Sequence, residues 1–261
     1  MNHRIGQQRA QSRSTKKAHW DDAEGWYSRC VGEKGHYYHQ SVVIPNALRL
    51  LNLKKGESLL DLGCGQGVLL RHLPKGISYT GVDASAALIE EAQRLSAGTF
   101  HVGDATESLP VEKKDFDTAC FILSLQNIES PEKAIAQASL HLKKGGKLLL
   151  VLNHPCFRIP RQTHWGVDEQ SQIQYRRLNL YLSSLKIPIQ TEPSRKETSP
   201  VTYSFHAPLS SFVSWLAQAH FAITGMEEWC SDKKSTGPSA KREDRARKEF
   251  PLFLAILAKK N

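Results

Sequence analysis

From about residue 57 onward, short apolar runs alternate with segments in which apolar residues recur every three or four positions. Short apolar runs are typical of buried strands, and the periodic segments are typical of helices that pack on one side. The predicted strands cover residues 57–62, 77–83, 99–105, 116–125 and 147–153. The predicted helices between them cover residues 67–73, 85–95 and 130–142. This alternation, in units of about 20–30 residues, predicts a parallel sheet with helices on both faces.

The pattern changes on both sides of this region. Before it, residues 18–30 and 41–51 predict two helices. After Asn153 the regular alternation stops, and the chain is rich in aromatic residues, arginine and proline as far as Pro200. The C-terminal part then predicts one helix and two strands, over residues 208–221, 221–229 and 250–260.

Composition limits the class of protein. Apolar residues make up 40% of the 261 residues, which is enough for a packed core. No apolar run reaches the roughly 18 residues that a membrane-spanning helix needs, so no membrane span is expected. The first residues lack the apolar stretch of a secretory signal, and the five cysteines form no C-x-x-C pair. We therefore expect no disulfide framework, no metal site and a reducing, cytoplasmic location.

The net charge of +9 is unevenly distributed. The first 20 residues hold five positive charges and no acid, whereas residues 21–157 hold 14 positive and 16 negative charges. Further positive charge lies in residues 158–200 and 231–249, the second of which is expected to be a loop. The excess of positive charge is explained by solvated side chains on the surface. The alternative is a surface that binds phosphate groups or anionic lipid.

The segment LLDLGCGQGVLL, residues 59–70, places Gly63, Gly65 and Gly67 directly after the first strand of the sheet. Glycines at this point allow a ligand to lie against bare backbone N–H groups. The spacing is not the G-x-G-x-x-G of dinucleotide-binding proteins, and no G-K-[ST] of a P-loop follows. Asp61, just before the turn, repels phosphate and suits a cation. The ligand is therefore expected to be cationic near the glycines.

Two more acids end the next two strands. Asp83 is placed to accept hydrogen bonds from both hydroxyl groups of a ribose. Asp104, in the sequence GDA, is placed to accept a hydrogen bond from an adenine amino group. Each acid has an ordinary alternative role as a helix cap or turn residue. Their occurrence at three successive strand ends favours a nucleoside-bearing ligand.

At these residues the sequence resembles the class I S-adenosylmethionine-dependent methyltransferases. The resemblance is carried, in family order, by LLDLGCGQG, TGVDAS, HVGDATESLP, FDTACFILSLQNI and LKKGGKLLLVLN. It covers residues 55–153 well and 205–258 loosely. It implies an α/β, Rossmann-like fold with a seven-stranded, mostly parallel sheet whose last strand is antiparallel. In outline the chain is also similar to the quinone-biosynthesis methyltransferases.

The resemblance implies S-adenosyl-L-methionine as the cofactor and no metal. The implied cofactor contacts are Asp61, Gly63, Gly65, Gly67, Asp83, Asp104, Ala105, Leu123 and Ser124. Helices before the sheet often close over the cofactor in such folds, and Tyr27, His36 and Tyr38 are candidates for this lid. Packing of the N-terminal helices is the alternative role for these three residues.

The resemblance and the pattern together divide the chain into five parts. These are a basic disordered arm (1–18), lid helices (19–54), a cofactor-binding core (55–153), a substrate-side insertion (154–205) and the C-terminal part of the same sheet (206–261).

The acceptor is expected beyond the fourth and fifth strands, where NHPCF (residues 153–157) leaves the sheet. This stretch differs in position from the [DN]-P-P-[YF] signature of amine methyltransferases, so their function is not transferred. Asn153 is a candidate pocket residue, and His154 and His206 are candidate general bases. Phe157, Trp165 and Tyr175 either line the pocket of a planar acceptor or form a small core within the insertion.

Three functions remain open from the sequence. The favoured one is methyl transfer to a small molecule, such as a quinone-type or natural-product intermediate. The second is methylation of RNA or protein, which the basic segments motivate although no RNA-binding module is recognisable. The third is a non-catalytic, cofactor-binding protein on the same fold.

Overall fold

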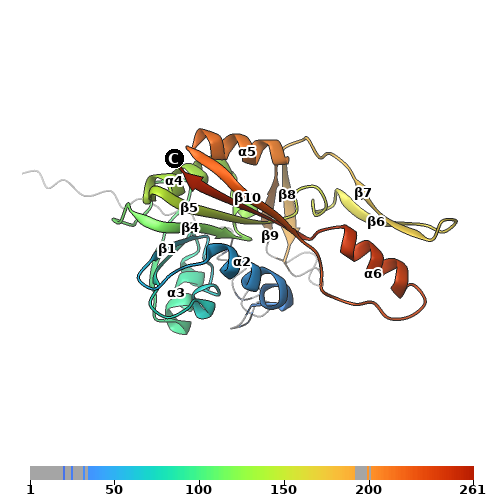
Figure 1. Ribbon diagram of the computed structural model, residues 1–261, viewed down its shortest axis with the longest axis horizontal. Helices are drawn as coiled ribbons and strands as arrows, with labels where there is room; N and C mark the ends of the chain where they lie inside the picture. The colour runs from blue at the N-terminus through green and yellow to red at the C-terminus, as the bar shows by residue number, and fades with distance from the viewer. Residues whose placement is uncertain (1–19, 21–24, 26–31, 33–34, 192–198, 200) are drawn as a thin grey trace, which may run out of the picture.

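The computed structural model describes residues 35–191 and 201–261, together with Trp20, Gly25, Gly32 and Ser199 (Figure 1). A seven-stranded sheet has the order β10-β11-β5-β4-β1-β2-β3. Its strands are β1 (Ser58–Leu62), β2 (Ser78–Asp83), β3 (Thr99–Val102), β4 (Phe116–Ile122), β5 (Leu142–Asn153), β10 (Phe221–Trp229) and β11 (Phe253–Lys260). The five neighbouring strands β5, β4, β1, β2 and β3 are parallel to one another, and β11 is antiparallel to both β5 and β10. The predicted sheet, including its antiparallel last strand, is confirmed.

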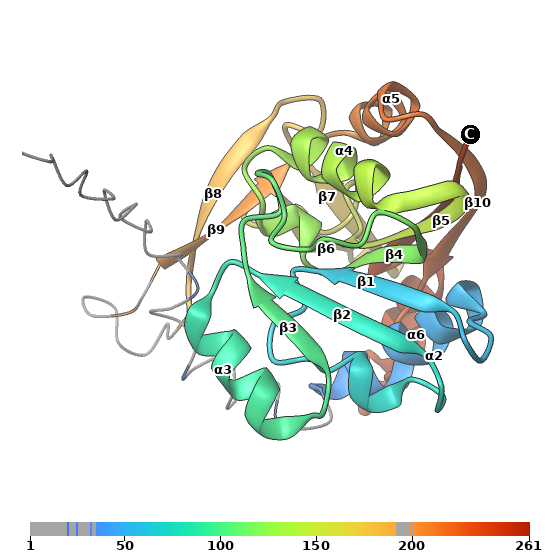
Figure 2. The ribbon, with the colours of Figure 1, turned by 90° about the vertical axis from the view of Figure 1, so that its left-hand side faces the viewer.

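Helices cover both faces of this sheet because its strands are apolar on both sides. Leu59 and Leu149 belong to one buried cluster, which also contains residues of α2 (Ile44–Leu51) and α3 (Ala86–Leu95). Their neighbours Leu60 and Leu150 belong to the opposite cluster, with α4 (Pro131–His141) and α5 (Leu209–Gln218). Figure 1 and Figure 2 show the two pairs of helices on opposite sides of the sheet. All four leucines are fully buried, as expected for parallel strands.

The helix predicted over residues 67–73 is wrong. This segment forms turns and a short 3-10 helix, η2 (Leu70–His72). Gly65 and Gly67 have φ angles of 53° and 73°, which a right-handed helix does not allow. Pro74 follows directly and limits the length further. By contrast, Ser85 caps α3 as its position suggests, because its hydroxyl accepts a hydrogen bond from the Leu88 N–H.

The N-terminal lid region is described only in part. The helix predicted over residues 41–51 is present as the π-helix η1 (His39–Val43) followed by α2. Of the helix predicted over 18–30, the structure describes Trp20 and Gly25, whereas the other residues, including Tyr27, lie outside the described residues. The basic arm over 1–18 also lies outside them.

The insertion and the late charged segment have structure that the apolar pattern did not indicate. The insertion forms two hairpins, β6 (Thr163–Asp168) with β7 (Ile173–Leu178), and β8 (Leu185–Gln190) with β9 (Val201–His206). The loop expected over 231–249 contains α6 (Ala240–Glu249), whose only buried residue is Ala246. Because α6 has no apolar face, hydrophobic periodicity could not reveal it. In Figure 1, α6 and the β6–β7 hairpin extend together beyond one end of the sheet.

Candidate active site

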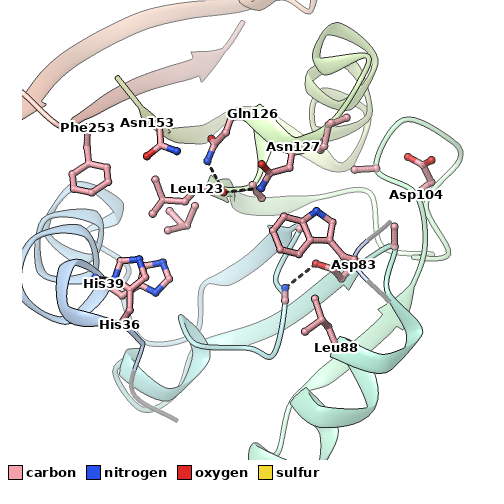
Figure 3. Close-up of a pocket in the computed structure, with 18 of the residues that line it drawn as sticks. His36, His39, Asp83, Leu88, Asp104, Leu123, Gln126, Asn127, Asn153 and Phe253 are labelled. Carbon is pink, nitrogen blue, oxygen red and sulfur yellow. Dashed lines mark hydrogen bonds between the residues drawn. The ribbon is translucent and has the colours of Figure 1, made fainter. Parts of the chain in front are cut away.

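A cavity of about 400 Å³ opens at the carboxyl ends of the parallel strands (Figure 3). Each of β1 to β5 ends at its wall, which is where ligands bind in open α/β sheets. The residues from these strand ends are Gly63, Gly65, Asp83, Ala84, Gly103, Asp104, Ala105, Ile122, Leu123, Ser124 and Asn153. The remaining wall comes from Trp20, His36, Tyr38, His39, Leu88, Gln126, Asn127, Ile128, Arg158 and Phe253.

The glycine turn after β1 lies against the end of β4. A Cβ atom on Gly63 would lie 2.4 Å from Ser124 Cβ, and the φ of Gly63 is 70°. The Ser124 hydroxyl donates a hydrogen bond of 2.7 Å to the Leu62 carbonyl, which holds the two strand ends together. Gly67 does not line the cavity; a Cβ atom there would lie 3.0 Å from the Phe100 ring. Gly63 is therefore needed for the turn itself, and Gly67 for packing behind it.

Asp83 links the turn to helix α3. One carboxylate oxygen accepts a hydrogen bond of 2.8 Å from the Gly65 N–H, and the other accepts one of 2.9 Å from the Ser85 N–H. Figure 3 shows the carboxylate of Asp83 at the cavity. Further along the wall, exposed Asp104 accepts hydrogen bonds from the N–H and hydroxyl of Thr106. The two acids that were predicted to bind ribose and adenine thus lie along one wall.

The end of β4 forms the middle of the cavity. Leu123 has a φ of 56°. Its carbonyl accepts a hydrogen bond of 2.7 Å from Gln126 Nε2 and one of 3.4 Å from Asn127 Nδ2. Leu123 and Ser124, which the resemblance implied, therefore lie in the wall together with two amide side chains that sequence reasoning did not select. The motif FDTACFILSLQNI contained these two amides, but their residue types alone gave no signal.

Asp61 lies behind the turn. Its side chain is 2% exposed and accepts hydrogen bonds from the Tyr79 hydroxyl at 2.8 Å and the Cys120 thiol at 3.5 Å. It lines a separate cavity of about 30 Å³ and does not line the large one. Burial raises the pKa of this carboxyl to about 6, and the two hydrogen bonds oppose that rise. Contact of Asp61 with the cofactor stays a prediction.

The raised pKa of Asp61 predicts a pH-dependent stability. Between about pH 4 and pH 6 the folded chain keeps a proton on Asp61 that the unfolded chain has released. The free energy of unfolding should therefore fall as pH rises through this window, by at most about 3 kcal/mol from this group. Asp61→Asn should make that fall shallower. Urea unfolding followed by circular dichroism at pH 4, 5, 6 and 7 measures it, and equal slopes for both proteins would refute the assignment.

Aromatic and imidazole groups form the N-terminal side of the cavity. The His36 and His39 rings stack with their centres 4.1 Å apart. Burial lowers the pKa of His39 to about 3, so this ring is neutral at physiological pH. The Tyr38 hydroxyl is hydrogen-bonded to Ser231 Oγ at 3.0 Å, and its ring packs edge-on against Phe253. His36 and Tyr38 thus lie where the lid was expected. His39, which sequence reasoning did not select, lies beside His36, and Trp20, also not selected, lines the same cavity.

Neither candidate base lines the large cavity. His154 is 1% exposed; its Nε2–H donates to Glu228 at 2.7 Å, and its Nδ1 accepts from the Cys156 N–H. Burial lowers its pKa, against the opposing effect of Glu228. His206 donates from Nε2 to the Tyr181 carbonyl at 2.8 Å and faces a cavity of only about 20 Å³. Both rings are held by structural hydrogen bonds, and their catalytic role stays a prediction.

The three aromatic residues of the insertion also lie outside the large cavity. Phe157 and Trp165 pack edge-on against Phe250, with ring centres 5.5 Å and 5.3 Å away. Tyr175 is 47% exposed on the β6–β7 hairpin. Phe157 and Trp165 therefore contribute to a small core that the insertion shares with Phe250 at the end of α6, whereas the alternative left open was a core within the insertion alone. Asn153, in contrast, lines the cavity as expected.

His154→Ala tests whether this ring supports the fold or the chemistry. Loss of the buried hydrogen bonds should lower the free energy of unfolding by about 1–3 kcal/mol. Cofactor affinity, measured by calorimetry, should change less than twofold because His154 does not reach the cavity. His164→Ala, at an exposed ring, is the matched control. A hundredfold fall in turnover with unchanged stability would instead restore His154 as a base.

Within the part of the chain that the structure describes, no three histidine, cysteine or acidic residues are grouped to hold a metal. In the same part, no helix is both long and apolar enough to cross a membrane.

A family model described as a methyltransferase domain matches residues 35–184. A demethylmenaquinone methyltransferase of Paenarthrobacter aurescens is 25% identical over 185 residues, which is 70% of this chain and 63% of its own length. An ajmaline N-methyltransferase of Rauvolfia serpentina is 28% identical over 67% of this chain and 56% of its length. The chain thus spans less than two thirds of either relative. The structure of an S-adenosylmethionine-dependent methyltransferase from Mesorhizobium loti superposes with a TM-score of 0.65, at 23% identity over 84% of this chain and 99% of that one.

Proposed function

We propose that this chain, which belongs to the methyltransferase domain family, transfers the methyl group of S-adenosylmethionine to a small-molecule acceptor. Family membership confirms the expected enzyme class. The expected cofactor is supported by the similarity to the S-adenosylmethionine-dependent enzyme of Mesorhizobium loti. The two named relatives act on different acceptors, to judge by their names, so the acceptor of this chain has to be inferred from its own residues.

The residues of the large cavity fit the cofactor. Gly63 and Gly65 bring Cα groups without side chains to the cavity wall, where a Cβ atom on Gly63 would collide with Ser124. Their N–H groups already donate to the Val82 carbonyl and the Asp83 carboxylate, so the expected contact of a ligand with bare N–H groups does not hold for these two glycines. Asp83 offers a carboxylate at the end of β2, where a ribose would be held, and Asp104 offers one at the end of β3. We propose that these residues hold the adenosyl part of the cofactor.

The chain's own contribution is binding and alignment. S-adenosylmethionine supplies an activated methyl group on a sulfonium centre, whose positive charge is lost on transfer. Well-aligned reactants react faster by the equivalent of about 7–11 kcal/mol, so a fixed acceptor position accounts for much of the rate. His36 and His39 are the imidazoles that line the cavity in the described chain. His36 is the candidate to take a proton from an acceptor, because burial lowers the pKa of His39 to about 3 and makes that ring a weak base.

The size and walls of the cavity support a small acceptor. Its volume of about 400 Å³ lies in the range that small-molecule sites occupy, about 300–1,000 Å³. Figure 3 shows Asp83 and Asp104 on one side of Leu123, and His36, His39, Asn153 and Phe253 on the other. The second side is the proposed acceptor position. That the cavity continues from the acids to this second group of residues is the observation on which the proposal chiefly rests.

Transfer of labelled methyl tests the proposal. The purified protein and labelled S-adenosylmethionine are added to an extract of the source cells, which is then separated into small-molecule, RNA and protein fractions. Label in the small-molecule fraction, absent with Asp83→Ala, is the expected result. Label in RNA or protein would contradict the proposed acceptor class and would give the basic segments of the chain a role in substrate binding.

A further inference from the structure

Arg158 is a cation in the cavity wall, and no acid among the described residues forms an ion pair with it. It lies five residues after β5, at the start of the insertion, and its guanidinium carbon is 5.1 Å from the centre of the Phe253 ring. Its side chain is partly buried and borders both the large cavity and the small one beside His206. Among the described residues, no carboxylate or carbonyl accepts a hydrogen bond from this guanidinium.

Other arginines of the described chain differ in this respect. Arg49, Arg94, Arg242 and Arg247 each form an ion pair with a glutamate or aspartate. Arg176 donates hydrogen bonds to the Phe157 carbonyl and the Thr163 hydroxyl. Burial lowers the pKa of Arg158, and the groups that act on it by their charge are Tyr38 and Arg176, not a carboxylate. Arginine stays charged in proteins, so an unpaired positive charge faces the cavity.

A second unpaired polar group lies beside Arg158. Gln126 borders the same two cavities, and its Nε2 donates to the Leu123 carbonyl. Its Oε1 is buried and has no hydrogen-bond partner. A buried acceptor oxygen without a partner is unusual, because its desolvation is not offset. This oxygen is therefore ready to accept a hydrogen bond from a ligand hydroxyl or amine.

We propose that the acceptor is a small carboxylic acid whose carboxylate is bound by Arg158 and whose hydroxyl or amine donates to Gln126. This inference rests on the proposed function and narrows its substrate class. A guanidinium presents parallel N–H groups that match the two oxygens of a carboxylate, and the surrounding low dielectric strengthens the pair. The rings of Phe253 and Tyr38 line the same side of the cavity and suit an aromatic body.

The carboxylate of the cofactor itself is the competing source of an anion. Arg158 packs over the Phe253 ring and borders the small cavity together with Asn153 and Gln126. Figure 3 shows Asn153 and Phe253 on the side of the cavity away from Asp83 and Asp104. This placement favours the acceptor. The experiment nevertheless has to separate the two sources by measuring the affinity for the cofactor product independently of the affinity for a carboxylate.

Calorimetry with matched probes makes this separation. The protein is first titrated with S-adenosylhomocysteine, and the saturated complex is then titrated with benzoate and, separately, with benzamide. The first variant is Arg158→Met, which keeps an apolar side chain against Phe253. The second is Arg158→Lys, which keeps the positive charge but not the paired N–H donors of a guanidinium. Arg94→Met, on the outer face of α3, is the control for loss of one positive charge.

The proposal predicts four results. S-adenosylhomocysteine binds wild type and Arg158→Met within twofold of each other. Benzoate binds the wild-type complex at least tenfold more tightly than the Arg158→Met complex, and Arg158→Lys recovers part of this difference. Benzamide does not distinguish the variants, and Arg94→Met behaves as wild type. Equal benzoate affinity in wild type and Arg158→Met would overturn the proposal.

Two other outcomes are also decisive. A tenfold loss of S-adenosylhomocysteine affinity in Arg158→Met would assign Arg158 to the cofactor and overturn the acceptor proposal. If S-adenosylhomocysteine does not bind the wild type, the proposed function itself fails, and the benzoate titration of the free protein still reports on the anion site. In the labelling experiment, the labelled product should contain a carboxyl group, which esterification followed by mass spectrometry detects. A labelled product without a carboxyl group would contradict the proposal.

Discussion

Gly63→Ala should abolish tight cofactor binding and destabilise the fold. The new Cβ would lie 2.4 Å from Ser124 Cβ, so the end of β4 or the turn has to move. The φ of 70° adds backbone strain, because side chains other than glycine rarely adopt it. Strain and overpacking of this kind each cost about 1–3 kcal/mol, which predicts a loss of about 2–6 kcal/mol in the free energy of unfolding.

Two further variants separate the causes. Gly237 has a similar φ of 85°, but a Cβ atom there would have no atom within 4 Å. The variant Gly237→Ala therefore measures the cost of backbone strain alone. The double variant Gly63→Ala with Ser124→Gly removes the collision and keeps the strain. Denaturant unfolding and calorimetry with S-adenosylmethionine measure both effects. If Gly63→Ala were no worse than Gly237→Ala and bound cofactor normally, the close approach of the turn to β4 would play no part in the site.

Asp83→Ala should weaken S-adenosylmethionine binding at least tenfold. The variant removes a carboxylate that faces the cavity and also leaves the N–H groups of Gly65 and Ser85 without their acceptor. The first loss acts on the ligand directly, and the second loosens the glycine turn and the start of α3. A tenfold change corresponds to about 1.4 kcal/mol, which is modest for the loss of a charged hydrogen-bond acceptor.

Calorimetric titration at constant ionic strength measures this effect. Asp83→Asn keeps one acceptor oxygen and should give an intermediate affinity. Asp115→Ala removes an exposed acid that pairs with Lys113 and should bind cofactor as the wild type does. Wild-type affinity in Asp83→Ala would show that the ribose is not held at the end of β2.

The sheet and the position of the site could be predicted because local sequence determines both. Strands that are buried on both faces appear as apolar runs, as in β5, and glycine with aspartate marks their carboxyl ends. Since parallel strands bring those ends to one edge, Gly63, Asp83 and Asp104 had to lie together if the sheet was right. They do line one cavity.

The proposed acceptor side could be predicted only in part, at Asn153 and His36, because the rest of it depends on contacts between distant segments. Phe253 reaches the cavity from the last strand, and Arg158 from the insertion, and neither belongs to a recognisable motif. His154 looked available in the sequence, but Glu228, 74 positions later, holds its ring. Such pairings follow from tertiary packing, and residue type gives no sign of them.

Binding of S-adenosylmethionine to the unmodified protein tests the central claim most directly. Calorimetric titration with S-adenosylmethionine, and separately with the dinucleotide NAD⁺, should give saturable one-to-one binding of the first and none of the second. That result would agree with a glycine turn that has Asp61 behind it and therefore does not favour a pyrophosphate. Binding of NAD⁺ in preference to S-adenosylmethionine would contradict the account.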